Sequence, residues 1–152
     1  MQKWLDGQMS LGAAANWEKD EIRIISEIAY SLAQQGRYGE AITLFEGLTA
    51  IAPATAYFQA ALGALHLRTG DFDQAVERFD RALKIEPNDI ISLVNRGESH
   101  IKAGKIVEAR RDLTAAVELA GRTPAKQIDV NDETQLSVKR ARALLQVYKQ
   151  IA

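Results

Sequence analysis

Small and bulky apolar positions recur every 34 residues through the middle of the chain. Gly36, Gly70 and Gly104 are separated by this spacing, and each opens the same short pattern. An apolar residue follows the glycine after two positions, a small residue after five and a bulky apolar residue after nine. The three copies are Tyr38, Ala41 and Phe45, then Phe72, Ala75 and Phe79, then Ile106, Ala109 and Leu113. A repeat of this length indicates a stack of similar units, each built from a pair of helices.

Residue types inside each repeat predict where the helices begin and end. Glycine tolerates the left-handed backbone that joins two helices, and proline stops a helix because it lacks a donor and clashes with the preceding turn. Pro53 and Pro87 therefore close the first two units, and Gly121 is expected to close the third. The expected helices cover residues 18–35, 38–52, 55–69, 72–86, 89–103 and 106–120. Asp71 and either Asn88 or Asp89 are well placed as helix N-caps.

The two flanks of the repeats carry further apolar residues. After a polar link, Val138, Ala141, Leu145 and Tyr148 are spaced three and four apart, which predicts an amphipathic helix over residues 132–151. Such a helix would cap the apolar end of the stack. Residues 1–17 contain Trp4, Leu5, Met9, Leu11 and Trp17. They are expected either to cover the first repeat as a short helix or to contact a second subunit, giving a homodimer.

The glycines, small residues and prolines at these places resemble the tetratricopeptide repeat. The resemblance implies an all-α fold in which three hairpins, at residues 22–55, 56–89 and 90–123, stack into a right-handed superhelix. Residues 1–17 are then an N-terminal segment, residues 18–123 the repeats, and residues 124–152 a linker and capping helix. Ile25, Gln59 and Leu93 stand where the family commonly has an early tryptophan.

In this family the first helix of each hairpin lines a concave groove that binds peptides. The positions carried over onto this chain are Arg23, Ser26, Tyr30, Tyr57, Ala60, Ala64, Leu67, Arg68, Ile91, Val94, Glu98, Ile101 and Lys102, with Ala33, Gln34, Ala61 and Asn95 beside them. One subclass grips a C-terminal carboxylate with lysine, asparagine and arginine. Its five places here hold Ser26, Tyr30, Ala61, Ile91 and Asn95, so that clamp is missing. What remains is an apolar floor with a charged rim.

The first unit, GRYGEAITLFEGLT, has Leu48 and Thr49 where most such repeats have alanine and leucine. With three repeats between an N-terminal segment and a C-terminal helix, the chain resembles the tetratricopeptide-repeat chaperones of bacterial type III secretion. Those chaperones keep hydrophobic translocator proteins soluble before export.

Composition adds mainly exclusions. The chain has 19 Lys and Arg against 20 Asp and Glu, a formal net charge of −1, so no general field favours nucleic acid or an anionic membrane. Cysteine is absent, which excludes disulfides and thiolate chemistry. No apolar stretch approaches the roughly 20 residues that span a bilayer. The N-terminus lacks the apolar run of a signal peptide, and we expect a cytoplasmic protein.

His66 and His100 are the best candidates for catalysis or metal binding, since they lie one repeat apart. The family usually has a packed aromatic ring at this place, and no third ligand is evident, so we interpret both histidines as packing residues. The sequence therefore predicts neither an enzyme nor a metal or cofactor site. It predicts a protein that binds an extended, partly hydrophobic peptide segment of a partner. The alternative is a self-assembling scaffold whose groove is filled by its own terminal segment.

Overall fold

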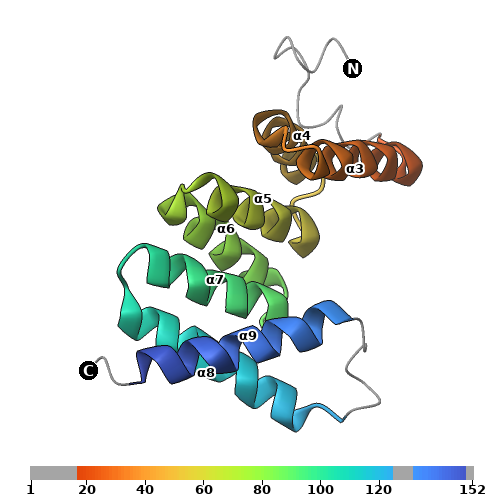
Figure 1. The fold of residues 1–152 in the computed structure, drawn as a ribbon. Helices are drawn as coiled ribbons and strands as arrows, with labels where there is room; N and C mark the ends of the chain where they lie inside the picture. The colour runs from red at the N-terminus through yellow and green to blue at the C-terminus, as the bar shows by residue number, and fades with distance from the viewer. Residues whose placement is uncertain (1–16, 125–131, 150–152) are drawn as a thin grey trace.

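The structure, a computed structural model, describes residues 17–124 and 132–149, and these form an all-helical stack of hairpins. Three helix pairs follow one another: α3 (Lys19–Gln34) with α4 (Tyr38–Ile51), α5 (Ala56–Thr69) with α6 (Phe72–Ile85), and α7 (Ile90–Lys102) with α8 (Ile106–Arg122). Helix α9 (Asp132–Tyr148) packs on both α7 and α8 and ends the described stack (Figure 1). The predicted fold class is confirmed. The calls on residues 1–16 and on residues 125–131 and 150–152 fall outside the described residues.

The hairpin turns use the repeating glycines as the sequence predicts. Gly36, Gly70 and Gly104 have φ angles of 77°, 85° and 78°, a left-handed conformation that costs glycine nothing because it has no Cβ. Aspartate side chains cap α6 and α7. Asp71 accepts a hydrogen bond from the Gln74 amide at 3.4 Å, and Asp89 accepts bonds from the amides of Ile91 and Ser92. Asp89 rather than Asn88 is therefore the cap of α7.

The end of the third repeat differs from the prediction. Gly121 does not close α8, which continues to Arg122. Thr123 then caps the helix with its amide and its hydroxyl, both of which donate to the Leu119 carbonyl, at 3.1 and 2.8 Å. The next residue is Pro124, so a proline does close this unit, three positions later than the 34-residue spacing would place it.

Close contact between the two helices of a hairpin depends on small residues. A Cβ on Gly63 would lie 2.8 Å from the ring of Phe79, and a Cβ on Gly97 would lie 2.9 Å from the side chain of Leu113. Phe79 and Leu113 are themselves buried, so they have little room to move away. The glycines thus let α5 approach α6, and α7 approach α8, more closely than any larger residue would.

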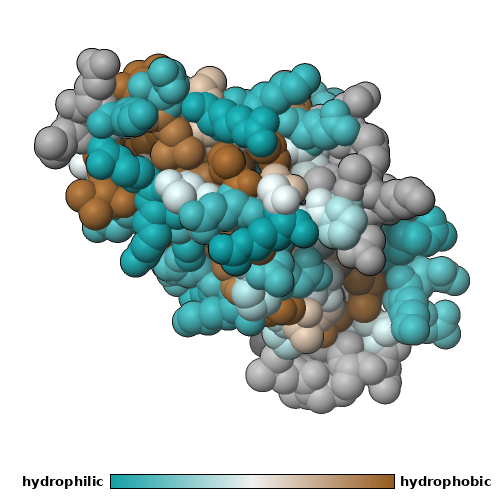
Figure 2. Space-filling view, turned by 90° about the horizontal axis from the view of Figure 1, so that it is seen from below, coloured by the Kyte–Doolittle hydropathy of each residue, from teal (hydrophilic) through white to brown (hydrophobic). Residues whose placement is uncertain are grey.

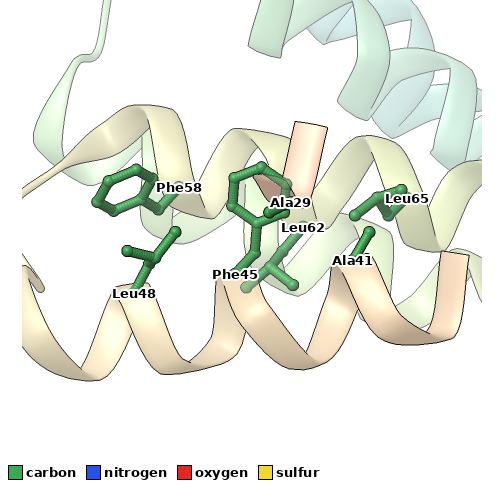
Figure 3. Packing of buried hydrophobic residues seen from close by; sticks show 7 residues of the cluster. All are labelled: Ala29, Ala41, Phe45, Leu48, Phe58, Leu62 and Leu65. Carbon is green, nitrogen blue, oxygen red and sulfur yellow. The ribbon is translucent and has the colours of Figure 1, made fainter. Parts of the chain in front are cut away.

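The first two repeats share an apolar core. Phe45 and Leu48 from α4 meet Phe58, Leu62 and Leu65 from α5, with Ala29 and Ala41 closing the α3–α4 hairpin (Figure 3). All seven side chains are 6% exposed or less. A second apolar cluster joins the third repeat to α9, through Val94, Leu113, Ala116 and Ala141. Helix α9 therefore buries the apolar end of the stack, as a capping helix is expected to do.

A polar network bridges the second and third repeats. Arg96 on α7 donates to Asp80 on α6 and, through two nitrogens, to both carboxylate oxygens of Asp112 on α8, each at 2.7 Å. The side chain of Asp112 is only 3% exposed. His100 lies beside it, with its Nε2 atom 3.7 Å from Asp112 Oδ2. A buried carboxylate is held here by a bidentate arginine, the geometry that best offsets its lost hydration.

Candidate peptide-binding groove

A cleft of about 590 Å³ lies between the first helices of the hairpins. It is lined by residues of α3, α5 and α7, by parts of α4 and of the turn before α7, and by one residue of α9. These residues are Tyr30, Ala33, Gln34, Tyr38, Phe45, Ala56, Tyr57, Ala60, Ala61, Ala64, Leu65, Arg68, Glu86, Asp89, Ile91, Ser92, Asn95 and Glu133. The volume lies within the range of sites that hold small ligands or a few side chains.

Three alanines of α5 make the cleft deep enough to admit a side chain. Ala60, Ala61 and Ala64 are spaced one, three and four apart, so they lie on one face of the helix and leave room above it. Tyr30 and Tyr57 also line the cleft and are 54% and 52% exposed. Large apolar surface left open beside small residues is suited to receive an apolar side chain from a ligand.

Tyr57 is held in place by aromatic packing underneath it. Its ring meets Phe45 edge-on at 6.3 Å and Phe58 edge-on at 5.8 Å between centroids. Partial burial raises the pKa of its phenol, and the nearby Tyr30 and Glu133 add to the effect. The hydroxyl therefore stays protonated at neutral pH and can donate a hydrogen bond to a ligand carbonyl.

Six of the thirteen expected groove residues line this cleft: Tyr30, Tyr57, Ala60, Ala64, Arg68 and Ile91. Seven do not: Arg23, Ser26, Leu67, Val94, Glu98, Ile101 and Lys102. Val94 is 0% exposed and belongs to the core beneath the third repeat, so it offers no surface to a ligand, contrary to the expectation. Arg23 is engaged on its own helix, where it donates to Glu27 at 2.8 Å.

Helix α9 accounts for two of the remaining positions. Arg140 lies 3.3 Å from a carboxylate oxygen of Glu98 and donates to the side chain of Asn95 at 2.6 Å. Ile101 packs against the cluster that contains Ala141 of α9. Helix α9 thus contacts two of the expected groove positions on the third repeat. The open cleft is left over the first two repeats and the start of the third.

Three acidic residues of the lining lie outside the expected set. Glu86 and Asp89 lie in the turn between α6 and α7, and Glu133 lies in the first turn of α9. The family resemblance identifies groove positions only on the first helix of each hairpin, so it did not point to Glu86 and Asp89 in the turn. Glu133 lies beyond the three 34-residue units, so the repeat spacing could not predict that it lines the cleft.

The surface combines apolar and polar areas. In Figure 2, apolar patches lie between hydrophilic side chains and form no single continuous band on the face that is shown. Exposed apolar side chains include Ile24 and Ile28 on α3 and Leu136 and Val147 on α9. No helix among the described residues is both long and apolar enough to cross a bilayer.

Neither histidine lines the cleft. His100 is 7% exposed, and burial lowers its pKa, while the Asp112 carboxylate acts in the opposite direction. His66 is half-buried on α5. No group of three or more metal-binding side chains occurs within residues 17–124 and 133–149.

Residues 32–96 match the family model of the tetratricopeptide repeat. Solved structures of type III secretion proteins share the fold over most of their length, and three of them illustrate the likeness. The translocator chaperone SycD of Yersinia enterocolitica type III secretion is 19% identical, with 95% of this chain and 96% of that chain covered and a TM-score of 0.74. PcrH of Pseudomonas aeruginosa, in complex with the chaperone-binding region of PopD, is 20% identical, with 88% of this chain and 95% of that chain covered and a TM-score of 0.78. A chain of a type III secretion complex from Aeromonas hydrophila is 20% identical, with 97% of this chain and 93% of that chain covered and a TM-score of 0.80.

One curated relative, the rhomboid protease GluP of Bacillus subtilis, is 37% identical over 67 residues. Those residues are 44% of this chain and only 13% of the relative, so the similarity is confined to a small part of that protein.

Proposed function

Since this chain carries tetratricopeptide repeats and shares its fold with translocator chaperones of type III secretion, we propose that it is a chaperone-like binding protein. Its cleft takes an extended, partly apolar segment of a partner protein. The observation that carries the proposal is the cleft itself, whose lining includes three alanines of α5 and two half-exposed tyrosines.

The chemistry of the lining supports a peptide ligand over a reacting substrate. Ala60, Ala61 and Ala64 offer space and apolar contact, and Tyr57 and Asn95 offer hydrogen bonds to a backbone. Peptide grooves of this sort combine a few apolar anchors with a small number of polar contacts that fix the register. Three of the similar structures are complexes with a segment of another protein: PcrH with the chaperone-binding region of PopD, PcrH with that of PopB, and SycD with a peptide of the translocator YopD.

A randomised peptide library selected against the purified chain tests this proposal. The strongest binders are then titrated against Ala64→Trp, which fills the floor, and Tyr57→Ala, which removes one side of the cleft. Each change should weaken binding at least tenfold, or about 1.4 kcal/mol, while leaving helical circular dichroism unchanged. Val107→Trp is the matched control, because Val107 is 81% exposed and does not line the cleft.

Two outcomes would overturn the groove as the binding site. One is that no library member binds the native chain. The other is that the best binders tolerate both cleft variants and fail with the Val107 control.

Self-association is a second candidate, favoured by the outer face of α3. Ile24 and Ile28 are 49% and 45% exposed. Their equivalents one repeat later, Phe58 and Leu62, are buried by the preceding hairpin. The first repeat thus presents an apolar face that has no preceding hairpin among the described residues. We propose that residues 1–17 and this face form the contact of a homodimer.

Deleting residues 1–17 tests the dimer. The molar mass measured by light scattering should fall by more than the deleted segment accounts for, while helical content per residue stays nearly constant. Ile28→Lys should act in the same direction in the full chain. Loss of the fold on deletion would instead assign the segment to the first repeat as a cap, and would remove the reason to propose a dimer.

A further inference from the structure

Charged residues are distributed unevenly around the cleft. Glu86, Asp89 and Glu133 line it where α7 and α9 begin, while the one cation of the lining, Arg68, lies in the last turn of α5. Tyr57, in the first turn of α5, lines the cleft together with these acids, and the charge of Glu133 helps to raise the pKa of its phenol. Arg68 is eleven residues further along, about 16 Å at the helical rise. The cleft therefore has an acidic edge and a basic edge, although the whole chain is nearly neutral.

Structural roles explain two of the three acids. Asp89 caps α7, with the amides of Ile91 and Ser92 and the Ser92 hydroxyl as its donors. Glu133 lies in the first turn of α9, where the helix dipole favours a negative charge.

Glu86 has no such role. It lies at the C-terminal end of α6, where the helix dipole disfavours a negative charge, and its amide, not its side chain, bonds back to Ala82. Within residues 17–124 and 133–149, neither Glu86 nor Glu133 has an ion-pair partner. Other acids of the concave side do have one, as Glu98 has with Arg140. A carboxylate that has no ion pair with these described residues, at an unfavourable helix end and on the edge of the cleft, is available to a ligand.

We propose that the cleft selects segments in which a lysine or arginine flanks the apolar anchor, with that cation against Glu86 and Glu133. The inference rests on the proposed groove and names the chemistry of its partner. The apolar anchor is received between Tyr30 and Tyr57, and the flanking cation fixes the direction in which the segment lies. Arg68 at the other edge disfavours the reversed orientation, because the cation would then meet a like charge.

Three peptide libraries test this selection. They share one randomised apolar core and differ only in the flanking residue, which is fixed as Lys, Gln or Glu. The best core is then made with each flank and titrated by calorimetry at low and at high salt. We expect the Lys-flanked peptide to bind roughly fivefold more tightly than the Gln-flanked one at low salt, since two exposed ion pairs contribute little more than this. High salt should reduce the preference.

Variants of the chain test whether Glu86 and Glu133 cause the preference for a lysine flank. Glu86→Gln with Glu133→Gln should bring the Lys and Gln flanks to equal affinity while leaving binding of the Gln-flanked peptide unchanged. Glu118→Gln is the matched control, because Glu118 is an exposed acid of α8 that does not line the cleft, and it should keep the preference.

The outcomes separate the two proposals. Equal binding of all three flanks, or tighter binding of the Glu flank, overturns the charge selection and leaves the groove standing. A preference for Lys that survives the double variant also overturns it, because the cation then contacts other residues. Absence of a binder in all three libraries overturns the groove and this inference together.

Discussion

The two interfaces between successive repeats are built from equivalent positions and filled with different chemistry. Between the first and second repeats, Leu62 is 0% exposed and packs with Phe45, Leu48 and Phe58. One repeat later the equivalent position is Arg96, which bridges Asp80 and Asp112 at 2.7 Å. The neighbours of Leu62 at the places of Asp80 and Asp112 are Glu46 and Arg78, which pair directly at 3.5 Å. The same hairpin packing therefore accommodates a leucine or an arginine.

The difference shows that the central residue and the two residues flanking it have to change together. An arginine at the central place needs an acid on each side, whereas a leucine there lets the two flanking residues pair with one another. Apolar contact tolerates small shifts of one hairpin on the next, while three hydrogen bonds to a planar guanidinium do not. The second interface should therefore restrict the angle between the second and third repeats more tightly than the apolar interface restricts the angle between the first and second.

The largest effect is expected from breaking the charged interface. Arg96→Leu leaves Asp112 buried without its bidentate partner and should lower the free energy of unfolding by about 3–5 kcal/mol in urea denaturation. Adding Asp112→Arg places an arginine opposite Asp80, as Arg78 lies opposite Glu46. The double variant should regain roughly 1–3 kcal/mol. A single variant that costs less than about 1 kcal/mol would contradict the bridging role of Arg96.

A change in the apolar interface should lower the free energy of unfolding somewhat less. Leu62→Ala removes a fully buried side chain and should destabilise by about 3 kcal/mol, through lost apolar contact and the cavity that remains. Unlike the Arg96 variant, it should cost the same at low and high salt, because no charge is exposed or unpaired. A marked salt dependence of the Leu62 variant would show that the Glu46–Arg78 pair depends on the leucine.

The smallest expected effect is on the pH dependence of stability, and it arises from the charged interface. Burial lowers the pKa of His100 below its ordinary value of 6.5. The unfolded chain then binds a proton more readily than the folded chain, so the stability from His100 is complete above pH 6.5 and is lost as the pH falls through the folded-state pKa. His100→Gln should flatten this slope in thermal melts. The matched His66→Gln variant on α5 should keep it, and equal flattening by both would contradict the assignment.

The repeat spacing by itself determined the helices, their pairing and their order. Glycines at positive φ and prolines after the second helices act locally, so their effect can be read from the residues alone. The family resemblance, carried over through the repeat spacing, named Tyr57, Ala60 and Ala64 on α5, and these three residues do line the cleft. The closing position of α8 was missed because the third unit ends three residues late, at Pro124 rather than Gly121.

Only the tertiary structure decided how much of the concave side stays open. Helix α9 comes after a linker that carries no repeat, so its register on α7 depends on packing between distant segments. That packing engages Glu98 with Arg140 and adds Glu133 to the cleft. Val94 is apolar at a groove spacing, and burial against Leu113 and Ala141 rather than any local preference moved it into the core. The sequence determined the hairpins because helix ends are local, and the structure decided the groove because its boundary is made by contacts between helices.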